Sequence, residues 1–395
     1  MALLDIPLDT IAERDLQRLI TTGAAESLYI DYKQQTYGNS ESDHVEFLAD
    51  MASFANTRGG DVVIGVAEAK GVPQSFTPFT GDADKECRRL EDIARTGLEP
   101  RIRNLRVRAV SLASGSHVLV IRVPRSFTPP HRVIYKNRNR FWARASAGKY
   151  EPNVEELRHL FNEAPRLAER IASFRMDRLI KIAAGDTPVP LGPSGKLAIH
   201  VVPVPAFADS RLLDVVSTAA SGTHIPLPPG GMSGANRLAV NLDGLVNYID
   251  QGVRMRHGYA QVFRSGAIEG VGELSRRDDD GLPYFVAAEF TDKIVFAVRQ
   301  YLDVLKSYEA GLPVYIFLSL CNVAQCYYRH SPERIAWVDD GPLGRELVAL
   351  PEVYVESFDA DVPTALRPAF NMLWNAFGFL RCDMYDAEGR WSGNS

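Results

Sequence analysis

The sequence predicts an α+β protein with two domains. An alternating run at 27–33 and a continuous apolar run at 61–66 indicate strands, and the segment between them, about 41–56, has the apolar stripe of a helix. Strand pairs at 105–123 and 133–144 then complete a mixed sheet in the N-terminal part. A chain of 395 residues is also too long for one typical core.

A segment rich in proline and glycine marks the boundary between the predicted domains. We expect an N-terminal domain at 1–164, a helix and linker at 165–195, and a separate α/β domain at 196–395. The second domain has no recognisable chemical motif, so sensing, docking and oligomerisation all stay open for it. Its predicted elements are strands at 196–204, 260–264 and 314–323, helices near 288–309 and 363–379, and a surface loop at 226–234.

Composition is that of an ordinary soluble protein, with 46% apolar and 24% charged residues. No apolar stretch is long enough to span a bilayer, and the first residues lack the basic and apolar regions of a secretion signal. Four scattered cysteines indicate neither a zinc site nor a disulfide framework. These features predict a cytoplasmic protein with no membrane partner.

Acidic side chains gather around the first predicted strand. Asp31 and Lys33 share one face of the strand, whereas Glu26 has the opposite parity and reaches them only if the chain bends before the strand. A third acid, Glu68, follows the apolar strand. Three carboxylates and a lysine can hold a metal ion and stabilise charge on a phosphate. The alternative is an ordinary salt-bridge cluster at the edge of a sheet, in which Asp31 pairs with Lys33 or Arg144.

Positive charge is concentrated in one block, although the net charge is −5. Residues 101–150 contain ten arginines, two lysines and no acid. This block indicates an extended anionic ligand, because neutralised phosphates release counterions. The alternative is pairing with acids from elsewhere, such as Glu86, Glu91 and Asp92. The candidates for contact with a nucleic-acid backbone are Arg58, Arg122, Arg125, Lys136, Arg138, Arg140 and Arg144.

Several ordered blocks of residues 20–160 together resemble the Schlafen AlbA_2 domain. They are Glu26-x4-Asp31-Tyr-Lys33, Phe54-Ala-Asn-Thr-x-Gly59-Gly60, Ile64-Gly-Val66, Val123-Pro-Arg125-Ser126, Pro130-His131 and Phe141-Trp-Ala-Arg144. The central block also has a structural interpretation, in which Asn56 bonds local backbone at a helix-to-strand turn. The alternative for this block is contact of Arg58 with phosphate.

The resemblance implies a metal-dependent endoribonuclease that cleaves structured RNA, with tRNA favoured. Position by position, the family's three active-site carboxylates fall on Glu26, Asp31 and Glu68, which would hold Mg2+ or Mn2+, with Lys33 as an electrostatic stabiliser. Asp31 and Glu68 differ from the usual residues by one methylene each, but both keep a carboxylate.

Ribonucleases of this family bind RNA with two similar lobes, so a chain with one lobe is expected to form a homodimer. A role in antiviral defence would fit a prokaryotic chain. The alternative function is that of a non-catalytic DNA- or RNA-binding regulator, because the family also contains such members.

Overall fold

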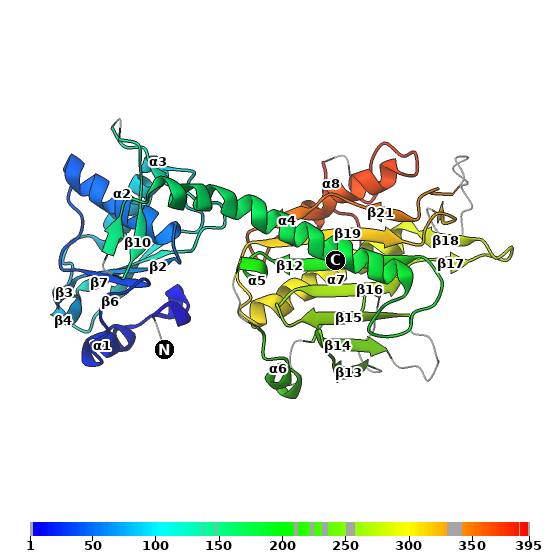
Figure 1. Ribbon diagram of the computed structural model, residues 1–395, viewed down its shortest axis with the longest axis horizontal. Helices are drawn as coiled ribbons and strands as arrows, with labels where there is room; N and C mark the ends of the chain where they lie inside the picture. The colour runs from blue at the N-terminus through cyan, green and yellow to red at the C-terminus, as the bar shows by residue number, and fades with distance from the viewer. Residues whose placement is uncertain are drawn as a thin grey trace. The chain divides into compact units, whose positions relative to one another are not determined.

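The computed structural model describes residues 3–136, 138–146, 148–208, 212–221, 225–230, 236–249, 257–329, 342–386 and 388–393. The predicted α+β class is confirmed, with a mixed sheet in the N-terminal part and further helices and sheets after it (Figure 1). The chain divides into two compact units, Met1–Arg166 and Leu167–Ser395. Residues 231–234 of the loop predicted at 226–234 lie outside the described ranges.

The first unit is built on a four-stranded sheet. In spatial order its strands are β1 (Ile30–Lys33), β2 (Gly60–Ile64), β7 (His117–Val123) and β6 (Arg106–Ser111). β1 and β2 are parallel, and the other pairs are antiparallel. A parallel pair needs a crossover connection, and the helix α2 (Glu41–Ala55) lies in that connection. Ser40 caps α2, because its hydroxyl accepts a hydrogen bond from the Asp43 amide.

Both faces of this sheet are covered. The helices α2 and α3 (Ala83–Gly97) pack on one face, against residues such as Val62 and Leu119. The N-terminal elements η1 (Leu3–Asp5), η2 (Leu8–Thr10) and α1 (Glu13–Thr21) pack on the other face, against Val63 and Val120. Since neighbouring strand residues face opposite sides, Tyr32 enters the N-terminal layer while Asp31 and Lys33 face α2.

Short strand pairs complete the first unit. They are the hairpin β3 (Val66–Ala69) with β4 (Val72–Phe76), the sheet β5 (Leu98–Glu99), β8 (Arg132–Val133) and β9 (Arg140–Phe141), and the hairpin β10 (Ala143–Ala145) with β11 (Gly148–Tyr150).

Three predicted element limits in this unit were wrong. The strand predicted at 61–66 ends at Ile64, because Gly65 has φ +101° and turns the chain into β3. The apolar positions of 7–22 predict one short helix from the sequence, but this segment is interrupted at Ile11, whose backbone is extended and whose side chain is buried in the core. The strand predicted at 27–33 begins only at Ile30, after a turn.

The second unit contains one large antiparallel sheet. Its order is β13 (Asn236–Val240), β14 (Gly244–Ile249), β15 (Gly258–Phe263), β16 (Ile268–Glu273), β12 (Lys196–Pro203), β19 (Val314–Cys321) and β21 (Leu347–Ala349), and β22 (Val353–Val355) also pairs with β19. The smaller elements are α5 (Pro205–Ala208), α6 (Val215–Ser221) and the sheet of β17 (Arg276–Arg277), β18 (Pro283–Val286) and β20 (Tyr327–Arg329).

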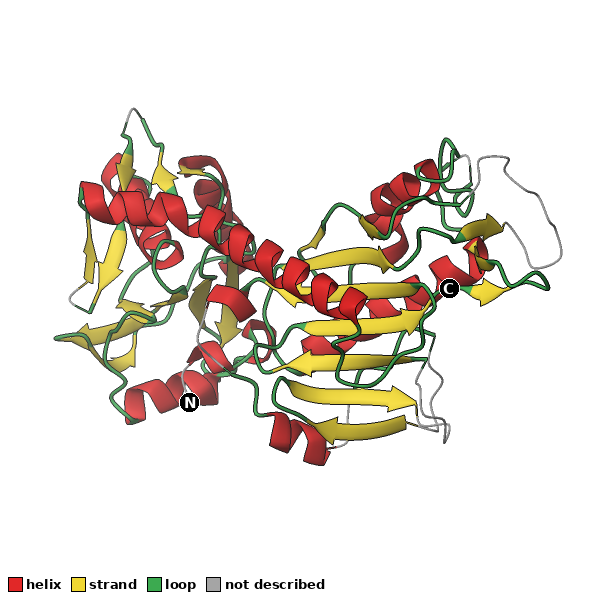
Figure 2. Ribbon diagram, turned by 45° about the vertical axis from the view of Figure 1, so that its right-hand side comes forward, coloured by secondary structure: helices red, strands yellow, loops and turns green. Residues whose placement is uncertain are grey.

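Helices cover both faces of the large sheet (Figure 2). α7 (Ala287–Ser307) and α8 (Val362–Asn375) pack on one face, and residues 167–184 of α4 (Val154–Ala184) pack on the other. α4 is continuous, so the helix expected at the start of the 165–195 segment begins instead at Val154, within the predicted N-terminal domain. Pro165 lies inside it and removes only one backbone donor. No helix in the described ranges is long and apolar enough to cross a membrane.

A buried ion pair anchors α4 to the large sheet. The Glu269 carboxylate is fully buried and accepts two 2.8 Å hydrogen bonds from Arg178, one of 2.9 Å from His200 and one of 2.8 Å from Tyr259. Burial alone would raise the pKa of Glu269, but Arg178 and His200 outweigh it and lower the pKa to about 2.

We expect Glu269→Gln to destabilise the second unit by about 3–5 kcal/mol, because it leaves the buried Arg178 without a counterion. Urea unfolding followed by circular dichroism measures this loss. As a control, Lys306→Ala removes the exposed pair with Asp359 and should cost less than about 1 kcal/mol. An equal loss of unfolding free energy in the two variants would contradict the prediction.

Because of Glu269, we expect the stability of the second unit to fall at acidic pH. The folded-state pKa of Glu269 lies below its ordinary value of 4.5, so its contribution is fully present above that pH and is lost as the pH falls towards about 2. Wild-type stability should therefore fall more steeply with pH in this range than that of Glu269→Gln. Curves of unfolding free energy against pH that run parallel for the two proteins would contradict this expectation.

Candidate functional site

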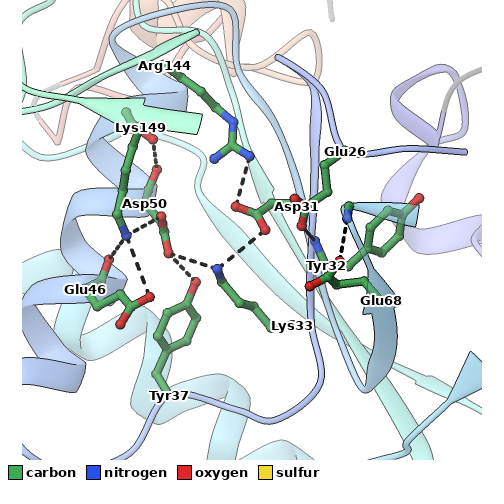
Figure 3. Close-up of polar contacts among 12 residues, drawn as sticks. Glu26, Asp31, Tyr32, Lys33, Tyr37, Glu46, Asp50, Glu68, Arg144 and Lys149 are labelled. Atoms are coloured by element: carbon green, nitrogen blue, oxygen red, sulfur yellow. Dashed lines mark hydrogen bonds and ion pairs between the residues drawn. The ribbon is translucent and has the colours of Figure 1, made fainter. Parts of the chain in front are cut away.

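The four predicted catalytic residues line one open pocket of the first unit, about 440 Å³ in volume (Figure 3). Glu26, Asp31 and Lys33 come from β1 and the turn before it, and Glu68 comes from β3. The structure therefore brings these four side chains into one site. The other residues that line the pocket are Tyr32, Gln34, Glu46, Asp50, Arg144, Gly148 and Lys149.

Asp31 is fixed between two cations. It is 6% exposed, and its Oδ2 lies 2.9 Å from Arg144 Nη2 while its Oδ1 lies 3.5 Å from Lys33 Nζ. Burial alone would raise the pKa of Asp31, but Lys33 and Arg144 outweigh it and lower the pKa. The carboxylate is therefore held in its ionised form.

Glu26 reaches the pocket because the chain bends just before β1. This bend was predicted, since Glu26 would otherwise point to the opposite face of the strand from Asp31 and Lys33. A hydrogen bond of 3.0 Å from the Ser27 amide to the Ile30 carbonyl closes a turn just before β1. The Glu26 carboxylate then accepts a 3.1 Å hydrogen bond from the Tyr32 amide. Burial raises the pKa of Glu26, and so do its hydrogen bond with Asp31 and the charges of Asp31 and Glu68. Three acids crowded together thus favour a proton or a cation among them.

Glu68 is close to the other acids but is engaged elsewhere. A bulge in the β3–β4 pairing falls between Ala67 and Glu68, and the Glu68 carboxylate accepts a hydrogen bond from the Gly71 amide in the turn of its own hairpin. In the described part of the chain, no three His, Cys, Asp or Glu side chains are gathered so that they could hold a metal ion. Glu26, Asp31 and Glu68 are neighbours, but they are not a preformed metal site.

Sequence reasoning missed Asp50, a buried acid on α2. Its Oδ1 accepts a 2.7 Å hydrogen bond from Lys149 Nζ, and its Oδ2 accepts one of 2.8 Å from the Tyr37 hydroxyl. Lys33 Nζ lies 3.9 Å from the same Oδ2. The available signal was an aspartate inside the apolar run of a helix, since such a residue is rarely buried without partners.

These contacts form a chain of six alternating charges along the pocket wall. Its members are Arg144, Asp31, Lys33, Asp50, Lys149 and Glu46, in which each residue lies within 4 Å of the next. This ion-pair chain is balanced, with three cations and three carboxylates. Glu26 and Glu68 are therefore the two acids of the pocket lining without a matching cation. The excess negative charge is concentrated at that end.

The Phe54–Gly60 block acts as a clamp on a distant segment. The Asn56 side chain accepts a 2.6 Å hydrogen bond from the His131 amide and donates 2.9 Å hydrogen bonds to the carbonyls of His131 and Trp142. The prediction that Asn56 bonds local backbone was wrong, because these partners are 75 and 86 positions away. Thr57 Oγ1 also accepts a hydrogen bond from the Arg144 amide, which helps to place Arg144 over Asp31.

Most cations predicted to contact nucleic acid form ion pairs within the first unit. Arg122 is paired with the buried Asp61 and also donates to the carbonyls of Leu3 and Ile6, and Arg144 lies 4.3 Å from the Phe54 ring centroid. The exposed or half-exposed pairs are Arg125–Glu163, Lys136–Glu41, Arg138–Glu41 and Arg140–Glu151. Arg58 is exposed and has no ion-pair partner among the described residues.

The acid partners of this basic block differ from those named from the sequence. Glu86 and Asp92 pair with Arg89 and Arg95 of their own helix, and Glu91 accepts a hydrogen bond from the Val107 amide. The block draws its partners instead from several segments before and after it. Its positive charge is thus largely neutralised locally.

Part of the first unit matches a known protein family. Residues 26–153 match the model of the family described as Schlafen, AlbA_2. No curated protein matches the chain. Two solved structures are similar to part of it, the DIP2311 protein from Corynebacterium diphtheriae and the N-terminal domain of a RecG-related protein from Nitrosomonas europaea.

The similarity to these two structures is limited. The first is 17% identical with a TM-score of 0.26, and the match covers 38% of this chain and 29% of that one. The second is 24% identical with a TM-score of 0.23, and the match covers 30% of this chain and 75% of that one. The chain thus spans less than a third of the length of the first structure. The family match, which contains the whole pocket lining, assigns residues 26–153 to the Schlafen AlbA_2 domain family.

Proposed function

We propose that the AlbA_2 domain binds nucleic acid and that its pocket hydrolyses phosphodiester bonds of structured RNA, with tRNA as the first substrate to test. One observation carries the proposal: Glu26, Asp31 and Glu68 meet Lys33 in one open pocket. Grouped carboxylates beside a lysine can orient an attacking group and stabilise charge on a phosphate. Lys33, Arg144 and Lys149 in the pocket lining and the exposed Arg58 support an anionic substrate.

The side chains have separate roles in this proposal. Glu26 and Asp31 orient the attacking group, and Lys33, 3.5 Å from Asp31, stabilises the negative charge that develops on the phosphate. Arg144 is a positioning residue, because its guanidinium is buried on Asp31. Glu68 supplies the third carboxylate.

The proposal includes Mg2+ or Mn2+, which Glu26, Asp31 and Glu68 would hold. Carboxylate oxygens are the donors that such hard cations prefer. The excess negative charge at this end of the pocket also supports a cation, because two uncompensated carboxylates repel a phosphate. A bound ion would supply Lewis-acid polarisation of the phosphate. Glu68 would have to give up its hydrogen bond from the Gly71 amide to join the other two.

Three further features belong to the proposal through the family resemblance. A homodimer would provide two lobes around a structured RNA, and a role in antiviral defence and a cytoplasmic location would follow for a prokaryotic chain. Shape and backbone contacts dominate recognition of structured RNA, so the exposed cations Arg58, Lys136, Arg138 and Arg140 are the expected contacts.

We expect Mn2+-dependent cleavage of total tRNA by the wild type and a loss of at least about a hundredfold in Glu26→Gln or Glu68→Gln. Both changes keep the size of the side chain but remove its charge. Denaturing gels of timed digests measure the rate. Asp92→Asn, which removes an exposed acid of α3, is the matched control and should cleave at the wild-type rate.

Two outcomes would refute the nuclease proposal. One is equal cleavage by the wild type and both glutamine variants, which would indicate a contaminating enzyme. The other is the absence of cleavage by the wild type with either ion.

One observation favours a second candidate, a non-catalytic nucleic-acid-binding regulator. Asp31 and Asp50 already share all three cations of the pocket, as expected for a structural ion-pair network. For this function we expect tRNA or DNA to bind equally well in EDTA and in Mg2+, with no change in nucleic-acid length. Gel shifts and denaturing gels of the same samples separate the two candidates, since loss of binding in EDTA would contradict the regulator.

A further inference from the structure

Asp50 holds two lysines from separate elements at the pocket wall. Asp50 is 1% exposed and lies on α2, whereas Lys33 lies on β1 and Lys149 on β11. Both ammonium groups lie within 4 Å of its carboxylate, at 3.9 Å and 2.7 Å. Tyr37 donates a 2.8 Å hydrogen bond to the same carboxylate and restrains it from the buried side (Figure 3).

The two ammonium groups keep hydrogen-bonding capacity towards the pocket. Each has three donors, and the one short contact of Lys149 is with Asp50, while both ion-pair contacts of Lys33 are 3.5 Å or longer. Their side chains are 28% and 24% exposed. Two like charges attached to one buried anion repel each other, so an anion on the open side would be stabilised between them.

We propose that Lys33 and Lys149 form a phosphate-binding pair for a nucleic-acid backbone and that Asp50 is the positioning residue of this pair. The inference rests on the proposed function in one respect, since it takes nucleic acid as the ligand. Lysines act as point charges, so the pair would hold a phosphodiester without reading the base attached to it. Arg144 is not part of the pair, because its guanidinium is buried between Asp31 and the Phe54 ring.

The variant Asp50→Asn provides a test, because the change in net charge and the loss of the anchor for the two lysines predict opposite changes in affinity for nucleic acid. The variant removes one negative charge from the pocket, so net charge alone predicts tighter binding of an anion. Loss of the anchor predicts weaker binding, because the lysines repel each other and leave their positions. Asparagine keeps the shape of the side chain and an oxygen that can accept from Lys149 or Tyr37, which limits the damage to the fold.

The measurement is fluorescence anisotropy of labelled total tRNA in EDTA, with the full-length chain and several salt concentrations. We expect Asp50→Asn and Lys149→Ala to weaken binding by about three- to tenfold. Lys149→Ala should also reduce the salt slope by about one. Lys149→Arg should bind within about twofold of the wild type, because it keeps the charge. Asp92→Asn makes the same charge change as Asp50→Asn outside the pocket and should not weaken binding. Circular dichroism checks that each variant is folded.

Three results would overturn the pair: no tRNA binding by the wild type in EDTA, unchanged binding in Lys149→Ala, or tighter binding in a folded Asp50→Asn. Cleavage is measured separately in Mn2+. Binding that depends on Lys149 without any cleavage would support the pair and refute the nuclease. Cleavage that depends on Glu26, with binding independent of Lys149 and Asp50, would refute the pair alone.

Discussion

The pocket depends on the buried ion pair between Asp31 and Arg144. Their side chains are 8% and 4% exposed, so each charge would be left in a poorly solvated position without the other. The pair joins β1, in the main sheet, to β10, in a peripheral hairpin. The Phe54 ring lies against the Arg144 guanidinium, and the Thr57 hydroxyl accepts a hydrogen bond from the Arg144 backbone amide. α2 and the turn after it therefore stabilise the same ion pair. The shape of the pocket follows from this junction.

The ion-pair chain gives the pocket two ends with different properties. From Arg144 to Glu46 each charge has an opposite neighbour, so this part is stabilised without any ligand. Glu26 and Glu68 lie beyond the balanced part. Glu26 accepts a hydrogen bond from the Tyr32 amide and neighbours Asp31 and Glu68, and Glu68 accepts one from the Gly71 amide. The pocket thus combines a charge-balanced wall with an acid-rich end.

Local patterns in the sequence predicted much of this site. Alternation along β1 placed Asp31 and Lys33 on one face and required a bend for Glu26, and the structure contains both features. Asp50 and Lys149 were missed, because they meet only when α2 packs against the β10–β11 hairpin, 99 positions further along the chain. The pairing of the basic block was left open for the same reason. Arg122 finds Asp61 through the register of β7 on β2, which no local pattern specifies.

The Asn56 clamp has a consequence for how this surface can change through evolution. Asn56 holds the segment around residues 131–142 through amide and carbonyl groups of the main chain, which nearly every amino acid provides. The attachment of the segment is therefore separate from the identity of its side chains. Lys136, Arg138 and Arg140 can therefore be replaced without loss of the main-chain bonds that Asn56 makes at His131 and Trp142, so relatives could acquire different ligand preferences here.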